Sequence, residues 1–391
     1  MGMNSAPNPD QTDMAQIPSL KALWAETLGD PQICIAVLDG PVDRAHPSLA
    51  AANLSELQTL ASGAPDGGAA ARRGAAMQPE AATQHGTHIA SVIFCQHDGP
   101  VKGIAPRCRG VSVPVFSDGP DGSIAPCSQL DLARAISQAI EAGAHIINIS
   151  GGELTPSGSA HPLLADAVQK CAERDVLIVA ATGNEGCDCL HIPGALPSVL
   201  AVGAMNAFGL PLAFGNWGAQ YRAQGILAPG ENIVGAKPDG GTVAQSGTSF
   251  ATPIVSGVAG LLLALQLKLG WQPTPQGVRA ALLESAYTCD PQVFSDCRPF
   301  LVGGLDIAGA HRLIRQGREE AAVRVTAADS RVLASATPVP EAPYGEPPRL
   351  REGDVAPDVS VQDHTGRWTR MSDYRGKSVV LWFYPRADTP G

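Results

Sequence analysis

The chain has 391 residues, of which 44% are hydrophobic and 16% are charged, and its formal net charge is −10. This length allows one to three domains with a large buried core, and the negative charge argues against nucleic acid as a partner. No apolar run outside a predicted core helix reaches the roughly 18–20 uncharged residues of a membrane span, so we predict no membrane partner. Residues 1–16 lack the basic and apolar regions of a secretory signal, so we expect a cytoplasmic protein.

The first predicted element is a fully buried strand over residues 33–38, Ile-Cys-Ile-Ala-Val-Leu, which ends on Asp39 and Gly40. An acidic residue at the carboxyl end of a parallel strand points into the crevice where α/β folds place their sites. Asp43 lies in the following loop without a strand before it, so Asp39 is the better candidate for a functional carboxylate.

The next element is a helix whose apolar run covers residues 89–94, and His85 lies at its start. Gly86 beside this histidine lets a substrate or another backbone segment come close. Residues 60–82 are rich in Ala and Gly, which predicts a loop between Asp39 and His85.

Strands and helices alternate through the middle of the chain. The predicted elements are a strand over 111–116, a helix over 130–141, a strand over 145–149, a helix over 163–173 and a strand over 176–181. This alternation predicts an α/β fold with a mostly parallel sheet and helices on both faces. Ser150, Gly151 and Gly152 follow one strand, and Asn184 follows the next on a glycine-containing turn, where its amide can donate to an oxyanion.

The run Ser-Gly-Thr-Ser-Phe-Ala-Thr-Pro, residues 246–253, places Ser249 at the start of an apolar helix over 250–265. The amino end of a helix favours developing negative charge. The chain order Asp39, His85, Ser249 is one of the three common orders of the Ser-His-Asp triad.

These motifs together resemble the subtilisin family of serine proteases (subtilases), over roughly residues 30–310. The resemblance implies a three-layer subtilisin-like fold, with Asp39 orienting His85, His85 as general base and acid, and Ser249 as nucleophile. Asn184 and the Ser249 backbone N–H would form the oxyanion hole. The residues implied to bind substrate are Ser150, Gly151, Gly152 and His191, although a surface position for the histidine remains an alternative.

Four stretches, residues 33–47, 128–150, 183–190 and 246–257, are similar to one branch of this family, the cyanobactin maturation proteases. That branch implies cleavage of ribosomally made precursor peptides inside the cell, alongside other peptide-maturation enzymes. Some of its members remove the leader by hydrolysis. Others close the peptide into a ring, and these carry a helical insertion near the segment between the catalytic acid and the catalytic base. The short Ala/Gly-rich stretch here favours hydrolysis. A macrocyclising transpeptidase and a catalytically silent peptide-binding module are the alternatives.

No cofactor and no metal ion are predicted, because residues 96–102 lack the Asn-rich pattern of the family's strong calcium loop. Nine cysteines are present, of which Cys34, Cys95 and Cys171 sit in apolar runs typical of the core. The pairs Cys187/Cys189 and Cys289/Cys297 are compatible with disulfides or with free thiols, and the sequence leaves both possibilities open.

The last part of the chain changes in composition. We predict an N-terminal extension (1–29), a peptidase domain (30–317), a Pro/Ala/Glu-rich linker (318–350) and a truncated thioredoxin-like fragment (351–391). Residues 351–391 resemble the start of a peroxiredoxin. No cysteine follows Cys297, so this fragment alone has no thiolate for peroxidase chemistry. Because so short a fragment buries little core, we expect it to be poorly ordered or loosely docked.

Overall fold

The computed structural model describes residues 12–59, 81–119, 122–155 and 158–317, together with the backbone of residues 360–362 and 368–370. The chain divides into two units, residues 1–327 and residues 328–391. In the second unit, the described backbone forms an antiparallel pair, β15 (Ser360–Gln362) with β16 (Trp368–Arg370). Three predictions concern residues outside the described ones. They are the linker, the order of the C-terminal fragment, and most of the Ala/Gly-rich loop.

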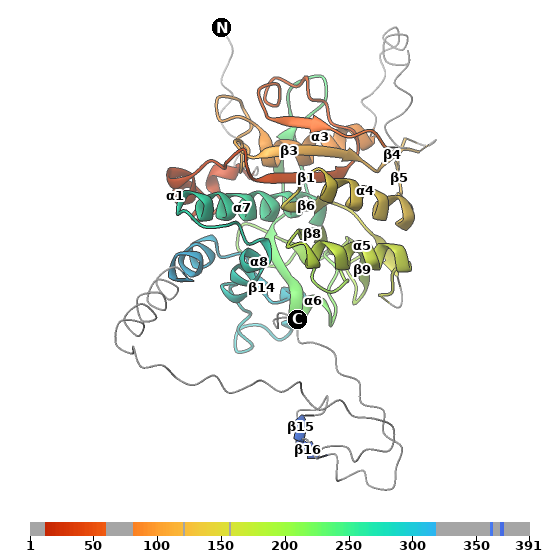
Figure 1. The fold of residues 1–391 in the computed structure, drawn as a ribbon, viewed down its shortest axis with the longest axis vertical. Coiled ribbons are helices and arrows are strands. Elements are labelled where there is room, and N and C mark those ends of the chain that lie inside the picture. The colour runs from red at the N-terminus through yellow and green to blue at the C-terminus, as the bar shows by residue number, and fades with distance from the viewer. Residues whose placement is uncertain are drawn as a thin grey trace, which may run out of the picture. The chain divides into compact units, whose positions relative to one another are not determined.

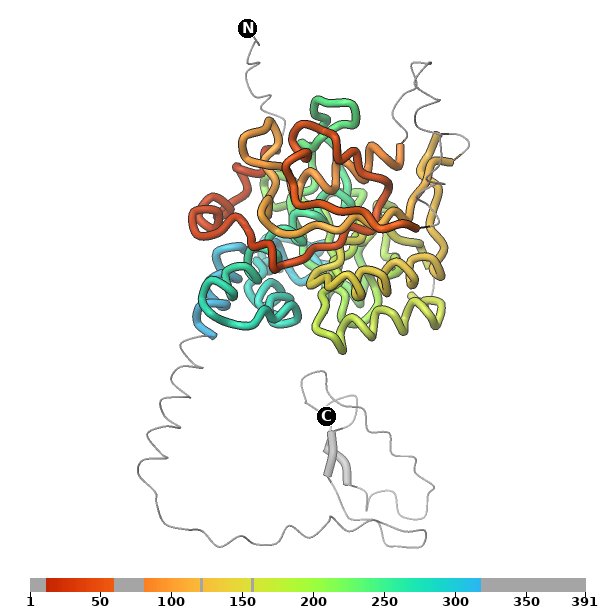
Figure 2. The backbone as a smooth tube through the Cα atoms, turned by 45° about the horizontal axis from the view of Figure 1, so that its top comes forward, coloured from red at the N-terminus to blue at the C-terminus, as the bar shows by residue number. Residues whose placement is uncertain are grey.

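The first unit is built on an eight-stranded sheet in the order β14-β11-β10-β8-β6-β1-β3-β2 (Figure 1). The strands are β1 (Cys34–Asp39), β2 (Leu54–Glu56), β3 (Arg109–Pro114), β6 (Ile146–Ile149), β8 (Leu177–Ala181), β10 (Leu200–Met205), β11 (Gly225–Pro229) and β14 (Gly303–Gly304). Every neighbouring pair is parallel. Figure 2 follows the chain from red and orange segments at one end of this unit to blue segments near the other. The prediction of a mostly parallel sheet is confirmed.

Helices cover both faces of this sheet, because side chains along each strand alternate between two apolar cores. In β1, Ile35 and Val37 join the core beneath one set of helices, whereas Ala36 and Leu38 join the opposite core. The first set is α1 (Leu20–Glu26), α3 (Ala81–Phe94), α7 (Thr248–Lys268) and α8 (Pro275–Glu284). The second set is α4 (Gln129–Glu141), α5 (Pro162–Glu173) and α6 (Tyr221–Gln224). The predicted three-layer fold is therefore confirmed.

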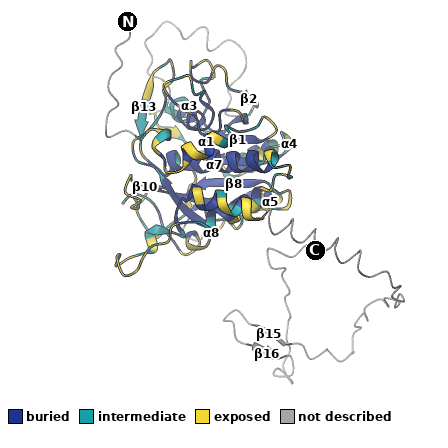
Figure 3. Ribbon diagram, turned by 90° about the vertical axis from the view of Figure 1, so that its left-hand side faces the viewer, coloured by how far each residue is buried: buried dark blue, intermediate teal, exposed yellow. Residues whose placement is uncertain are grey.

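Helix α7 is the central helix of the first core, as its dark colour in Figure 3 indicates. It is long and apolar enough to cross a membrane, yet 94% of its most apolar window is buried inside the protein. Such burial identifies α7 as the core helix of a folded domain. The helix begins at Thr248, so Ser249 occupies its first turn.

Short elements complete the first unit. They are η1 (Met14–Gln16), η3 (Arg298–Phe300) and three antiparallel pairs: β4 (Ser117–Asp118) with β5 (Ile124–Ala125), β7 (Glu153–Thr155) with β9 (Leu190–Ile192), and β12 (Ile233–Ala236) with β13 (Thr242–Gln245). The β7–β9 pair joins the segment after Gly152 to the strand that carries His191.

Both cysteine pairs that the sequence left open form disulfides, Cys187–Cys189 and Cys289–Cys297. Cys34, Cys95 and Cys171 are buried free thiols in the core, as predicted. Burial raises the pKa of Cys95 and of Cys171 to about 12. These thiols therefore stay protonated at neutral pH, which suits residues that only fill space.

Candidate active site

Asp39, Ile149 and Ala181 are the last residues of β1, β6 and β8, which are neighbours in the sheet. Because these strands are parallel, their carboxyl ends lie at one edge, where open α/β sheets bind ligands. Asp39 lies at this edge, and the segments that leave β6 and β8 there carry Ser150–Gly152 and Asn184.

Asp39 and His85 form a buried pair at this edge. The Asp39 carboxylate is fully buried, and its Oδ1 lies 2.7 Å from His85 Nδ1. The same oxygen accepts a hydrogen bond from the backbone N–H of Gly40, at 2.7 Å. With Nδ1 held by the carboxylate, Nε2 of His85 is the ring nitrogen left to exchange a proton with a substrate or a nucleophile.

Two glycines allow the end of β1 to approach helix α3 this closely. A Cβ atom on Gly40 would lie 1.9 Å from the carbonyl oxygen of Ala82, and one on Gly86 would lie 2.2 Å from the carbonyl oxygen of Gly40. Both contacts are with backbone, which has no room to move away. The sequence prediction that Gly86 admits another backbone segment is confirmed, and that segment is the one carrying Asp39.

The pKa of His85 is raised above its ordinary value. Burial acts in the opposite direction, but the charge of Asp39 and its hydrogen bond to the ring outweigh it. His85 is therefore a stronger base than a histidine free in water, as a group that must remove a proton from a hydroxyl requires.

Ser249 lies in the first turn of α7, and the residue after it contacts His85. The ring of Phe250, the next residue, lies 5.4 Å from the His85 ring, measured between centroids, and 4.7 Å from the ring of His88. The first backbone N–H groups of a helix have no partners within the helix, so the N–H of Ser249 is available to a negatively charged oxygen. The structure thus places Asp39 and the first turn of α7 beside the same histidine, and the role of Ser249 as nucleophile stays a prediction.

Asn184 lies in the loop after β8, and Thr248 fixes the orientation of its side-chain amide. Its Oδ1 accepts hydrogen bonds from the Thr248 backbone N–H at 2.9 Å and from the Thr248 hydroxyl at 3.1 Å. With the oxygen held in this way, the Nδ2 group is directed elsewhere and is free to donate. Thr248 was not predicted from the sequence, although it directly precedes Ser249.

Replacing Asn184 by alanine is expected to lower kcat by about 10²–10³-fold, because the oxyanion loses one positioned donor. Because Asn184 Oδ1 also accepts two hydrogen bonds from buried Thr248, unfolding by denaturant should first establish that the variant folds. Steady-state kinetics with a peptide substrate would test this. A change confined to KM would show instead that the amide contributes to substrate binding and not to the transition state.

The segment Ser150–Gly152, which follows β6, lies beside an apolar cleft of about 590 Å³. Gly151 and Gly152 line it, together with Phe116, Ile124 and Leu132. The side chain of Ser150 is buried and accepts a hydrogen bond from Asn148 Nδ2, whose own Oδ1 accepts one from Ser256 of α7. Only the backbone of Ser150 is therefore placed to meet a peptide.

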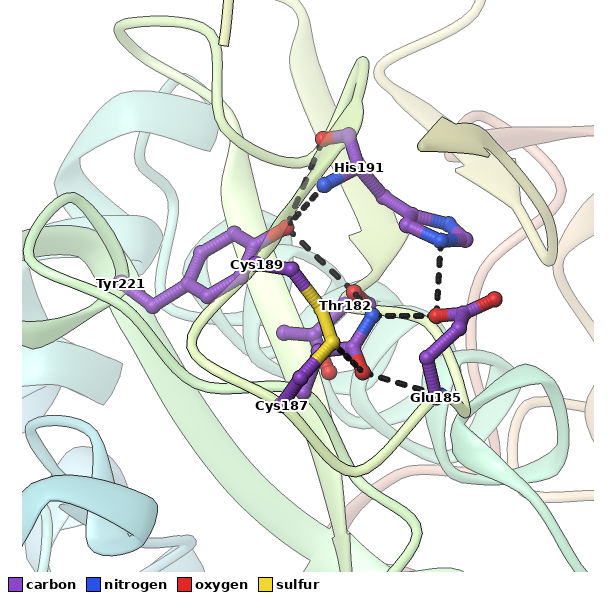
Figure 4. The surroundings of a disulfide bond; sticks show 7 residues. Thr182, Glu185, Cys187, Cys189, His191 and Tyr221 are labelled. Atoms are coloured by element: carbon purple, nitrogen blue, oxygen red, sulfur yellow. Dashed lines mark hydrogen bonds and ion pairs between the residues drawn. A yellow bond between two sulfur atoms is a disulfide. The ribbon is translucent and has the colours of Figure 1, made fainter. Parts of the chain in front are cut away.

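His191 lies close to Gly152 and Gly183, and Figure 4 shows its ring directed toward Glu185. A Cβ atom on Gly152 would lie 3.2 Å from His191 Nδ1, and one on Gly183 would lie 2.6 Å from Nε2. The histidine is 8% exposed, and its Nε2 lies 2.9 Å from Glu185 Oε2. The predicted contact of His191 with a substrate side chain stays a prediction.

A hydrogen-bond network holds the loop between Asn184 and His191. Asn216 Oδ1 accepts from the Glu185 backbone N–H at 2.9 Å, and its Nδ2 donates to the Thr182 carbonyl. The Tyr221 hydroxyl accepts from the His191 backbone N–H at 2.8 Å, as Figure 4 shows, and burial raises the pKa of Tyr221 to about 12. Sequence reasoning missed Asn216 and Tyr221, which lie some thirty residues away in the chain.

Over the described parts of residues 12–317, no group of three or more His, Cys, Asp or Glu side chains is arranged to hold a metal ion. The side chains at this site offer a hydroxyl, a base paired with a carboxylate, and a positioned amide donor.

Comparison with known proteins gives two family matches. Residues 30–323 match the Subtilase family, and residues 353–391 match the AhpC/TSA family. The second match agrees with the resemblance of this segment to the start of a peroxiredoxin. The chain is also 34% identical to the M-protease of Shouchella clausii over 197 residues, 49% of each protein. The chain thus spans about half the length of several curated relatives that it matches.

Two solved structures are similar over most of the first unit. The prenylagaramide maturation protease PagA is 54% identical, with a TM-score of 0.68, and the match covers 76% of this chain and 99% of PagA. The PatG macrocyclase domain is 34% identical, also with a TM-score of 0.68, and the match covers 79% of this chain and 99% of that domain.

Proposed function

Because the chain belongs to the subtilase family, we propose that it is a serine endopeptidase with Asp39, His85 and Ser249 as its catalytic triad. The observation that carries this proposal is the buried 2.7 Å contact between Asp39 Oδ1 and His85 Nδ1, beside the helix turn that holds Ser249. Serine, histidine and aspartate in this relation are the machinery of acyl transfer.

In the proposed reaction, Ser249 Oγ attacks the carbonyl carbon of a peptide bond while His85 Nε2 takes the hydroxyl proton. The carbonyl oxygen becomes an oxyanion, stabilised by Asn184 Nδ2 and the Ser249 backbone N–H. His85 then gives its proton to the leaving amine, so the C–N bond breaks and an acyl-enzyme remains. Attack by water, again with His85 as base, releases the second product and restores Ser249.

We propose a ribosomally made precursor peptide as the substrate. The 54% identity to PagA and to PatA supports this choice, since PagA is a prenylagaramide maturation protease and PatA is a patellamide maturation protease. Identity to the PatG macrocyclase is lower, at 34%, which favours hydrolysis over ring closure. Gly151 and Gly152 lie between strands β6 and β7 and line a cleft, a place suited to an extended peptide segment.

Endopeptidase activity can be tested on an unfolded polypeptide, such as reduced and alkylated α-lactalbumin, with Ser249→Ala as the control. We expect fragments from the wild type and none from the variant. Equal fragmentation by both proteins would point to a contaminating protease, and an intact polypeptide in both would count against the proposed activity.

The type of product separates hydrolysis from ring closure. Synthetic precursor peptides would be incubated with the protein and the products weighed by mass spectrometry. Hydrolysis gives fragments whose masses sum to the substrate plus one water molecule. A product lighter by one water than the linear core peptide would overturn the hydrolytic assignment in favour of a macrocyclising transpeptidase.

We also propose that the reaction takes place in the cytoplasm, alongside other peptide-maturation enzymes. The disulfides Cys187–Cys189 and Cys289–Cys297 count against this part of the proposal, because disulfides persist mainly in oxidising compartments. Cell fractionation of the native host would test it, and recovery of the protein from a secreted or periplasmic fraction would overturn it.

A further inference from the structure

The turn that carries Asn184 takes its shape from contacts with other segments. Residues 182–186 belong to no helix or strand. The backbone N–H groups at the two ends of this turn donate to carbonyls elsewhere in the chain, those of Val202 and Phe214. Within it, Gly183 has a φ of 99°, in the left-handed region that favours glycine. The bonds at the two ends leave the middle of the turn, where Asn184 lies, to be fixed by other contacts.

Asn216 supplies these contacts and bonds to the turn on both sides of Asn184. Before Asn184, the Asn216 Nδ2 donates to the Thr182 carbonyl at 3.1 Å. The Asn216 backbone N–H donates to the Gly183 carbonyl at 3.2 Å. After Asn184, the Asn216 Oδ1 accepts from the Glu185 backbone N–H at 2.9 Å. One residue thus bridges the backbone on either side of the predicted oxyanion donor.

The side chain of Asn216 is buried and has no room to move. It is 2% exposed, and a Cβ atom on Gly183 would lie 2.3 Å from its Nδ2. Nδ2 also donates to the Glu185 carboxylate, so both polar atoms of the amide bond to residues 182–185. Because a buried polar group left without a partner is costly, this arrangement resists displacement of the turn.

Thr248 and Asn216 hold different parts of Asn184. Thr248 bonds to the side-chain Oδ1, whereas Asn216 bonds to the backbone of the neighbouring residues. A donor stabilises an oxyanion best at about 2.7–3.1 Å from it. Because the Asn184 amide moves with its backbone, the bond from Thr248 to Oδ1 does not by itself keep Nδ2 at that distance.

We propose that Asn216 is a positioning residue of the peptidase, which holds the backbone of Asn184 so that Nδ2 meets the oxyanion. The inference rests on the proposed function and adds to it a residue that acts only through Asn184. Displacement of a catalytic group by about 1 Å can lower a rate by about 10²-fold, so loss of Asn216 should lower kcat.

The experiment is a double-mutant cycle on Asn216→Ala and Asn184→Ala. The substrate is a fluorescence-quenched peptide copied from the first site that wild type cleaves in reduced and alkylated α-lactalbumin. Asn206→Ala is the matched control, since Asn206 Oδ1 also accepts backbone N–H bonds, from Phe208 and Leu210, but in the tight turn directly after β10. Circular dichroism would first establish that each variant is folded.

We expect Asn216→Ala to lower kcat by about 10–100-fold and to change KM by less than about threefold. Asn206→Ala should match wild type. In the Asn184→Ala background, the same Asn216 substitution should lower kcat no further, because the donor that it positions is already gone. An equal loss of kcat in both backgrounds, or an effect on KM alone, would overturn the inference.

Asn216→Asp provides a second variant because the alanine substitution leaves a buried gap. Aspartate keeps the size and an acceptor for the Glu185 N–H, but an ionised carboxylate has no N–H for the Thr182 carbonyl, so its kcat should also fall only when Asn184 is present. Failure of both variants to fold would assign Asn216 to the stability of the whole fold and overturn the inference. A wild type that cleaves nothing would overturn the peptidase function itself, whereas a cleaving wild type with independent losses would overturn the inference alone.

Discussion

Replacing Ser249 by alanine is expected to lower kcat by about a million-fold. The variant has no hydroxyl to form the acyl-enzyme, so His85 and the oxyanion donors have nothing to activate. The residual rate over the uncatalysed reaction should reflect only substrate binding and the remaining donors. Single-turnover cleavage of a peptide with a fluorescent reporter is sensitive enough to measure this loss.

A second substitution tests whether the three residues act as one unit or contribute independently to kcat. His85→Ala should cost nearly as much as Ser249→Ala, and the double variant should be no slower than either single variant, because the residues act as one unit. Rates that fall multiplicatively in the double variant would contradict this account. So would a Ser249→Ala protein that keeps a tenth or more of wild-type activity.

Replacing Asp39 by asparagine is expected to lower kcat by about 10⁴-fold. The amide matches the carboxylate in size, so the buried position stays filled. Asparagine carries no charge and can present its amide N–H₂ to the ring, which favours the wrong tautomer of His85. Unfolding by denaturant should first establish that the variant folds, since the Gly40 N–H also loses a charged acceptor.

The same substitution changes the pH dependence in a defined direction. Catalysis needs neutral His85, and the Asp39 carboxylate raises the pKa of that histidine against the effect of burial. Wild-type kcat/KM should therefore rise with pH through a pKa above the ordinary histidine value of about 6.5. In Asp39→Asn the charge is gone while burial remains, so the acidic limb should move to lower pH. An acidic limb at the same pH in both proteins would show that another group controls it.

The sequence predicted the catalytic edge of the fold well because each motif carries its own local structure. A continuous apolar strand ending in Asp39, an apolar run after His85 and a serine before another apolar run each indicate an element. The helix that carries His85 begins earlier than predicted, at Ala81. The fold then brings Asp39 against His85, and Phe250, the residue after Ser249, against the same ring. The glycines beside Asp39 and His85 can also be recognised from the sequence, since a glycine at such a place indicates that another backbone segment comes close.

What the sequence did not reveal depends on contacts between distant segments. The hydrogen bond from the Thr248 N–H to Asn184 joins residues that are 64 positions apart in the chain. The hydrogen bond from the Glu185 N–H to Asn216 joins residues that are 31 positions apart. Their residue types are common and their spacing follows no period, so no local pattern identifies them.

The central claim is that Asp39, His85 and Ser249 form an assembled triad, and intact-mass labelling with a fluorophosphonate probe tests it most directly. Wild type, Ser249→Ala and His85→Ala would be treated in parallel, after circular dichroism has established that each is folded. The account predicts one adduct on wild type, mapped to Ser249, and none on either variant. A folded wild type that takes up no probe, or that carries the adduct on another residue, would contradict it and favour a silent peptide-binding module.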